Sequence, residues 1–275
     1  MIQGTSSGSG KTTLVAALCR IFTNSGYNVC PFKSQNMSNY SYIGKDFEIS
    51  RAQAMQAIAA RTEISPHMNP ILLKPLGKNR NSVFVQGKFY KKLSAYEYYK
   101  KFVFPYGFNF ISNSFDILRK KYDLIIIEGA GSPAEINLEK FDIANMKVAA
   151  ILNSPVILIT DTDRGGSFAS IVGTLQLLDN KYKKLVKGFV FNKFRGDLEI
   201  LKPGFRKIKQ FTGRSVFGTI PMIDFSLPEE DSLNVKPKNM IWNKKNIQKM
   251  DREIEKLSKF VNSNINIKAV ERLIK

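Results

Sequence analysis

The residues at the start of this 275-residue chain carry its clearest chemical signal. Small residues let successive backbone N–H groups turn inward around phosphate oxygens, and the predicted helix that follows adds its positive N-terminus. Lys11 supplies a mobile charge for the β- and γ-phosphates, and the Thr12 hydroxyl can ligate Mg²⁺. The segment therefore predicts binding of ATP with Mg²⁺. The predicted loop consists of Gly4, Thr5, Ser6, Ser7, Gly8, Ser9, Gly10, Lys11, Thr12 and Thr13.

Phosphoryl transfer also needs carboxylates that hold the metal and cations that offset charge on the transferred group. Lys33 follows one apolar strand and Glu128 ends another, at the edge where open α/β sheets bind ligands. A helix cap or a turn is the alternative explanation for Glu128. Glu48 and Arg51 begin a predicted helix, and an exposed helix end explains them equally well.

Alternating strands and helices must position these residues. Strands are expected at 1–3, 28–32, 123–128, 155–160, 186–192 and 215–220. Helices are expected at 10–25, 48–62, 94–103, 110–121, 167–179, 198–212 and 244–261. Near-continuous apolar strands that alternate with helices predict an α/β fold with a doubly wound, mostly parallel sheet.

The chain is expected to form one phosphate-loop domain at 1–233, followed by a basic linker and a C-terminal helix at 234–275. Residues 63–110 are rich in Pro, Asn, Lys and Tyr and break the alternation of strands and helices. We interpret them as an insertion over the sheet edge.

Composition restricts the classes of partner. Lys and Arg number 42 against 23 Asp and Glu, a net charge of +19, which suits a polyanionic partner but also a lysine-rich solvated surface. No nucleic-acid motif accompanies this charge, and no apolar run reaches the roughly 18–20 residues of a membrane helix. No signal peptide is visible, so we expect a cytoplasmic protein with no nucleic-acid or membrane partner. Two cysteines and the single His67 are too few for a disulfide framework or most metal sites.

Nine segments together resemble the synthetase domain of the cobyric acid synthase family, in family order from residue 2 to about 233. The resemblance implies a fold of the dethiobiotin synthetase and MinD type. It also implies ATP-dependent amidation of peripheral carboxylates on adenosylcobyrinic acid a,c-diamide through acyl phosphates. The matching segments are IQGTSSGSGKTTLVAALCRIF, PFKSQNMS, EISRAQAMQA, MNPILLKP, YDLIIIEGAGSPAEINL, DIANM, PVILITDTDRGGSFASIVGTL, VKGFVFNKFRGD and LPEEDSL.

The resemblance also implies roles for individual residues. Thr12, Glu128 and, less directly, Glu48 would hold Mg²⁺, while Lys11 and Lys33 would neutralise the γ-phosphate. Asn192 would read the adenine edge. Asp142 is a further catalytic candidate, and an ion pair between Asp163 and Arg164 is the structural alternative for those two residues. The candidates for contact with the corrinoid substrate are Gln35, Asn36, Glu135, Asn137, Asp161, Asp163, Arg164 and Arg195.

Family members usually carry a second, glutaminase domain with a nucleophilic cysteine in a Gly-x-Cys-x-Gly elbow. These 275 residues contain no such elbow, since Cys19 and Cys30 lie inside synthetase motifs. We therefore expect the glutaminase domain to be absent and ammonia to come from a separate glutaminase subunit or from solution. Ser50 departs from the family pattern, as does the segment 76–81, and the segment between Ser38 and Glu48 is one residue short. The last two belong to expected substrate-side loops, so substrate specificity follows less firmly than ATP use.

Three alternatives are weighed against this interpretation. Other enzymes of the same fold, such as dethiobiotin synthetase, are disfavoured by the SPAEINL and NKFRGD segments. A MinD-like regulatory ATPase is disfavoured because the loop lacks the extra lysine near its start. A binding-only remnant would have no reason to retain Lys11, Thr12, Lys33 and Glu128 together. The order of amidation and the formation of a homo-oligomer are left open by the sequence.

Overall fold

The computed structural model describes residues 1–228 and 240–274, and contacts within the chain divide it into two units. The first unit consists of Met1–Leu14, Glu128–Phe225 and Ser258–Lys275. The second unit consists of Val15–Ile127 and Ser226–Leu257. The domain boundary predicted at residue 233, and the end of the LPEEDSL segment, lie outside the described residues.

The first unit is built on a four-stranded parallel sheet in the order β1-β10-β11-β12. Every residue of β10 is buried, as a strand covered on both faces requires. The elements of this unit are β1 (Ile2–Gly4), η3 (Ile136–Phe141), α5 (Met146–Ile151), β10 (Val156–Asp161), α6 (Ser167–Leu177), α7 (Asn180–Lys183), β11 (Val186–Phe194), α8 (Leu198–Thr212), β12 (Ser215–Pro221) and α10 (Ile267–Glu271).

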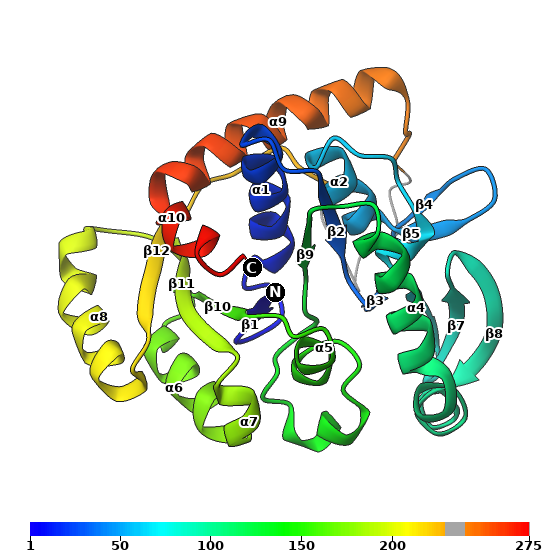
Figure 1. Cartoon of the computed structure of the whole chain (residues 1–275), viewed down its shortest axis with the longest axis horizontal. Coiled ribbons are helices and arrows are strands. Elements are labelled where there is room, and N and C mark those ends of the chain that lie inside the picture. The colour runs from blue at the N-terminus through cyan, green and yellow to red at the C-terminus, as the bar shows by residue number, and fades with distance from the viewer. Residues whose placement is uncertain (229–239, 275) are drawn as a thin grey trace. The chain divides into compact units, whose positions relative to one another are not determined.

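Apolar side chains of the strands and helices form the core of the first unit. Leu158, Phe189 and Phe191 on the strands pack with Ile171 of α6 and Ile208 of α8. Helices α6 and α8 contact each other, and Figure 1 shows β12 between α8 and α10. The four strand positions predicted for this unit are confirmed to within two residues at each end. The sheet therefore places the ends of β1, β10 and β11 at one edge.

Among its described residues, the second unit contains three sheets, two of two strands and one of four. Strands β2 and β9 pair in parallel, β4 and β5 pair antiparallel, and a mixed sheet has the order β3-β6-β7-β8. Helices α1 and α9 contain residues of both units. The elements are α1 (Lys11–Asn24), β2 (Val29–Phe32), β3 (Gln35–Met37), β4 (Ser41–Ile43), β5 (Glu48–Ser50), α2 (Arg51–Ala59), η1 (Pro66–Met68), β6 (Ile71–Gly77), β7 (Arg80–Val85), β8 (Lys88–Ser94), α3 (Ala95–Glu97), η2 (Tyr98–Gly107), α4 (Phe108–Arg119), β9 (Leu124–Ile127) and α9 (Lys244–Asn264).

The helix predicted at 48–62 is wrong at its start. Glu48–Ser50 form strand β5 and pair with Ser41–Ile43, and the helix α2 begins at Arg51. Ser50 ends the strand and caps the helix, because its hydroxyl accepts a hydrogen bond from the Ala52 N–H. The stretch 63–110 holds β6, β7 and β8, which form an antiparallel meander on β3. Because these strands follow one another through turns, the stretch lacks the alternation of strands and helices from which the other strands were predicted.

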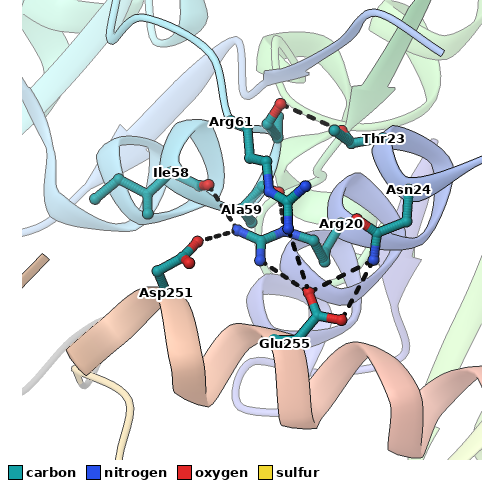
Figure 2. Close-up of polar contacts among 9 residues, drawn as sticks. Arg20, Thr23, Asn24, Ile58, Ala59, Arg61, Asp251 and Glu255 are labelled. Atoms are coloured by element: carbon teal, nitrogen blue, oxygen red, sulfur yellow. Dashed lines mark hydrogen bonds and ion pairs between the residues drawn. The ribbon is translucent and has the colours of Figure 1, made fainter. Parts of the chain in front are cut away.

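Arg20 of α1 connects three helices of the second unit although its side chain is fully buried (Figure 2). Its guanidinium donates to the carbonyls of Ile58 and Ala59, which are the last residues of α2. It also forms ion pairs with Asp251 and Glu255 of α9. A planar fork of five donors suits such a site, and a cation at a helix C-terminus is favourable. Arg20 thus fixes α2 and the first part of α9 to α1.

Among the described residues, no helix combines the length and the apolar character needed to cross a membrane.

Candidate active site

The phosphate loop runs from the end of β1 to the first residue of α1. Gly8 and Gly10 adopt φ angles of +71° and +98°, which glycine reaches without strain. A Cβ atom at Gly4 would lie 2.3 Å from Ser9 Oγ and 2.9 Å from Lys11 Nζ, so a side chain there would collide with the loop. These glycines let the backbone close around a small anion at the positive end of α1.

Lys11 lies inside this loop and not on the surface. Its side chain is buried, and its Nζ donates to the carbonyl oxygens of Ser6 at 3.0 Å and Gly131 at 3.1 Å. The Gly131 carbonyl belongs to the segment that follows Glu128. The charge of Lys11 is therefore held next to the loop backbone, and its contact with the triphosphate stays a prediction.

Thr12 and Glu128 form the central polar pair of the site. The Thr12 hydroxyl donates to Glu128 Oε1 at 2.8 Å, and the Glu128 side chain is fully buried. A hydroxyl and a carboxylate are the oxygen donors that Mg²⁺ prefers, and Mg²⁺ usually takes few protein ligands beside phosphate and water. The residues present thus fit the metal. No group of three or more metal-ligating side chains occurs in the part of the chain that the structure describes.

The ends of β10 and β11 contribute Asp161 and Asn192 next to the loop. Asn192 Nδ2 donates to Ser9 O at 2.8 Å, and Lys193 Nζ donates to both Gly8 O and Asp161 Oδ2 at 2.7 and 2.8 Å. Asp161 is buried and also accepts a hydrogen bond from the Asp163 N–H. Contact of Asn192 with adenine stays a prediction, since its amide nitrogen is bonded to the loop itself.

The segment after Glu128 is held by polar contacts to the start of α5. Asn145 donates to Ala130 O at 2.6 Å and accepts from the Ala130 N–H at 3.1 Å. Asp142 accepts hydrogen bonds from the N–H groups of Ala144, Asn145 and Lys147. The Asp142 carboxylate is therefore bonded to the backbone at the start of α5, and its catalytic role stays a prediction.

The other candidates of the first unit lie on exposed segments. Asp163 forms an ion pair with Arg195 at 2.8 Å, so its partner is not the neighbouring Arg164 that the sequence suggested. Arg164 is exposed after β10. Glu135 and Asn137 are exposed at the start of η3. Contact of these exposed side chains with the substrate stays a prediction.

Four candidates belong to the second unit. Lys33 follows β2 and is buried, while Gln35 accepts a hydrogen bond from the Tyr98 hydroxyl at 2.8 Å. Asn36 is buried and donates to Ser50 Oγ and Gln53 Oε1. The Glu48 carboxylate accepts hydrogen bonds from Ser41 and Lys74 within this unit. Glu48 as a metal ligand and Lys33 as a phosphate contact stay predictions.

Sequence reasoning missed two residues that shape the site, Lys193 and Asn145. Lys193 lies in the NKFRGD segment, and its position directly after Asn192 at a strand end was the available signal. Asn145 follows Asp142 in the DIANM segment. No sequence pattern there predicts that the Asn145 side-chain amide forms hydrogen bonds with the backbone of Ala130. The Lys193 contact joins residues 185 positions apart in the chain, and the Asn145 contact joins residues 15 positions apart.

The cysteines have the surroundings of core residues. Cys19 and Cys30 are both fully buried and neither is part of a disulfide, and burial raises the pKa of the Cys30 thiol well above its usual range. A thiol held in its protonated form is a poor nucleophile. This agrees with the sequence interpretation that neither cysteine serves a glutaminase reaction.

A strand, a glycine-rich loop and a helix, beside parallel strands that end at the same edge, define a P-loop nucleotide-binding protein. Residues 1–235 match the family model of the CobQ/CobB/MinD/ParA nucleotide binding domain, and the chain belongs to this family. The predicted fold class is thereby confirmed.

Curated relatives are cobyric acid synthases. The chain is 53% identical over 242 residues to a probable cobyric acid synthase of Thermococcus kodakarensis, covering 86% of this chain and 49% of that protein. It is 52% identical over 232 residues to the cobyric acid synthase of Caldanaerobacter subterraneus, covering 84% and 45%. The resemblance found in the sequence is confirmed, and the chain spans about half the length of the curated relatives that it matches.

A solved structure of the septum site-determining protein MinD from Pyrococcus horikoshii, complexed with Mg-ADP, aligns with a TM-score of 0.40 and 15% identity. The alignment covers 95% of this chain and 97% of that one.

Proposed function

We propose that this chain uses ATP and Mg²⁺ to convert peripheral carboxylates of adenosylcobyrinic acid a,c-diamide into amides, in cobalamin biosynthesis. The observation that carries the proposal is the buried contact between Thr12 and Glu128, beside Lys11 in the phosphate loop. Identity of about half the residues to cobyric acid synthases supports the choice of substrate.

The chemistry explains why ATP is needed. A carboxylate is a poor electrophile, so a substrate carboxylate oxygen attacks the γ-phosphorus and the bond from that phosphorus to the β–γ bridging oxygen breaks, releasing ADP. The resulting acyl phosphate carries a good leaving group. Ammonia then attacks the carbonyl carbon, the bond to the phosphate oxygen breaks, and loss of a proton leaves the amide and inorganic phosphate. Covalent activation of this kind divides one difficult step into two easier ones.

The residues of the first unit have distinct tasks in this proposal. The loop N–H groups bind the triphosphate, and Lys11 offsets charge that develops as the γ-phosphate is transferred. Thr12 and Glu128 hold Mg²⁺, which when bound draws charge from the phosphate oxygens. Because Glu128 is buried, its interaction with a bound metal ion would be stronger than at a site open to water.

The nitrogen in this proposal is ammonia, taken from solution or from a separate glutaminase subunit. Cys19 and Cys30 are buried core residues and neither has the surroundings of a nucleophile. Exposed Arg164 and Arg195 near the strand ends suit a substrate that carries several carboxylates.

The test measures ADP release and corrinoid mass together, with Mg·ATP, adenosylcobyrinic acid a,c-diamide and ammonium chloride. We expect ADP release to depend on the corrinoid, and each turnover to replace one carboxyl hydroxyl by an amino group. Lys11→Ala should abolish both signals. Glu199→Gln, which changes an exposed carboxylate on α8, is the matched control and should behave as the parent chain.

ATP turnover that ignores the corrinoid, with no change in its mass, would contradict the proposal and favour a regulatory ATPase. Glutamine replacing ammonium chloride should give no product with the purified chain, and product restored by a glutaminase would identify the second source of ammonia.

A further inference from the structure

Two consecutive residues at the end of β11 hold two consecutive carbonyl groups of the phosphate loop. Asn192 Nδ2 donates to Ser9 O at 2.8 Å, and Lys193 Nζ donates to Gly8 O at 2.7 Å. In a trans peptide the C=O and N–H bonds point in opposite directions. Fixing the Gly8 carbonyl toward Lys193 therefore turns the Ser9 N–H away from β11, and the bond from Asn192 does the same for the Gly10 N–H.

Lys193 is itself held firmly. Its backbone has a φ of +57°, a left-handed conformation that residues with a side chain seldom adopt and that the surroundings must enforce. Its Nζ forms an ion pair at 2.8 Å with Asp161, whose side chain is only 7% exposed. The next residue of that strand end, Thr162, donates through its N–H and its hydroxyl to the Asn192 carbonyl at 2.9 and 2.8 Å. The ends of β10 and β11 are thus joined to each other by hydrogen bonds and an ion pair, next to the loop.

Gly10 shows how closely Asn192 is packed against the loop. A Cβ atom at Gly10 would lie 2.1 Å from Asn192 Nδ2, a distance that no side chain could adopt. The position is therefore restricted to glycine by the Asn192 contact as well as by its φ angle of +98°. Loop and strand end fit each other as a pair.

We propose that Asn192 and Lys193 are positioning residues that hold the phosphate loop in its ligand-binding shape before nucleotide arrives. The carboxylate of Asp161 balances the charge of Lys193, so the contribution of Lys193 is to loop geometry and not to the charge that meets the phosphates. The inference rests on the nucleotide-binding part of the proposed function and is independent of the corrinoid reaction.

The test measures amide hydrogen exchange of the loop in nucleotide-free protein, together with the Kd values of Mg·ADP and Mg·ATP. Lys193→Met should speed exchange at Ser9 and Gly10 and weaken both nucleotides by a similar factor, roughly five- to tenfold, as expected for loss of about one hydrogen bond. Lys187→Met is the matched control, since Lys187 lies on the same strand, is exposed and bonds only to Lys184 O in the described contacts.

Asp161→Asn provides a second variant that keeps the Lys193 side chain but removes its charged partner. We expect loop exchange and nucleotide Kd to change in the same direction as in Lys193→Met, by a smaller factor. Circular dichroism verifies that each variant is folded. If Lys193→Met does not fold, Asp161→Asn is used for the test instead.

Loop exchange equal to that of the parent chain in these variants would overturn the proposal. Loss of ATP affinity much greater than loss of ADP affinity, with unchanged exchange, would also overturn it and would make Lys193 a direct charge contact. No corrinoid is present in the test, so failure of the amidation proposal leaves these outcomes untouched.

Discussion

Thr12 and Glu128 are separated by 116 positions in the chain, yet their side-chain oxygens meet at 2.8 Å in a buried site. The contact arises because the loop places Thr12 in the first turn of α1 and Glu128 directly follows β9. In the proposed function these two oxygen donors would be the protein's share of a Mg²⁺ site, and the phosphates would supply further ligands. At the residue scale, the proposed metal binding therefore depends on the side chains of Thr12 and Glu128.

The pair leads to a prediction about metal dependence. Thr12→Val and Glu128→Gln should each lower kcat for ATP use by about 100-fold or more, because each removes a ligand of the ion that stabilises the transition state. The double variant should be little worse than either single variant, since residues that act as one site are not additive. The measurement is a Mg²⁺ titration of ADP release.

Glu139→Gln, an exposed carboxylate on η3, is the control and should leave the Mg²⁺ titration unchanged. Additive losses in the double variant would show that Thr12 and Glu128 serve separate sites.

At the scale of elements, Arg20 connects α1 to α2 and α9 within the second unit. Its fully buried guanidinium meets the C-terminus of α2 and two carboxylates of α9 (Figure 2). Such a group is tolerated inside a protein only while its charge is matched. The packing of α9 against α1 and α2 therefore depends on Asp251 and Glu255.

Asp251→Asn combined with Glu255→Gln should destabilise the fold by roughly 2–4 kcal/mol, because it leaves the Arg20 charge buried without its partners. Asp116→Asn removes an exposed pair with Arg119 on α4 and should cost less than about 0.5 kcal/mol. Urea unfolding measures both. Equal stabilities for the double variant and this control would contradict the role assigned to Arg20.

The element scale also shows where sequence patterns failed. Glu48–Ser50 read as the start of a helix because Ser50 and Arg51 are followed by alanines and glutamines. In the structure this three-residue segment pairs with Ser41–Ile43, and such short strands carry too few residues for an alternating pattern to appear. The hairpins of 63–110 were missed for a different reason, because β6, β7 and β8 follow one another through turns without the intervening helices that the α/β pattern predicts.

At the scale of the whole molecule, the net charge of +19 is the dominant property. A strongly positive surface raises the local concentration of anionic ligands, and salt screens this attraction within a Debye length of about 10 Å at 0.1 M. The proposed corrinoid substrate carries several carboxylates. The charge that first suggested a polyanionic partner is thus compatible with a small anionic substrate.

The KM for adenosylcobyrinic acid a,c-diamide should therefore rise severalfold between about 0.05 and 0.5 M KCl, while kcat stays nearly constant, because screening weakens encounter and not chemistry. The KM for ammonia, which is uncharged, should not change and serves as the internal control. A corrinoid KM that is indifferent to salt would mean that the positive charge has no part in substrate capture.

Sequence by itself determined the phosphate loop, the strands of the first unit and the family. These features depend on local residue types and on apolar runs, which can be recognised without knowledge of the tertiary structure. It also selected Lys11, Thr12 and Glu128, whose chemistry follows from their types and from their places at strand ends. Only the tertiary structure showed the direct contact between Thr12 and Glu128, the ion pair of Asp163 with Arg195, and the bonds from Asn192 and Lys193 to the loop. These contacts join segments more than thirty positions apart, and their geometry is set by how the sheet brings strand ends together, which no local pattern encodes.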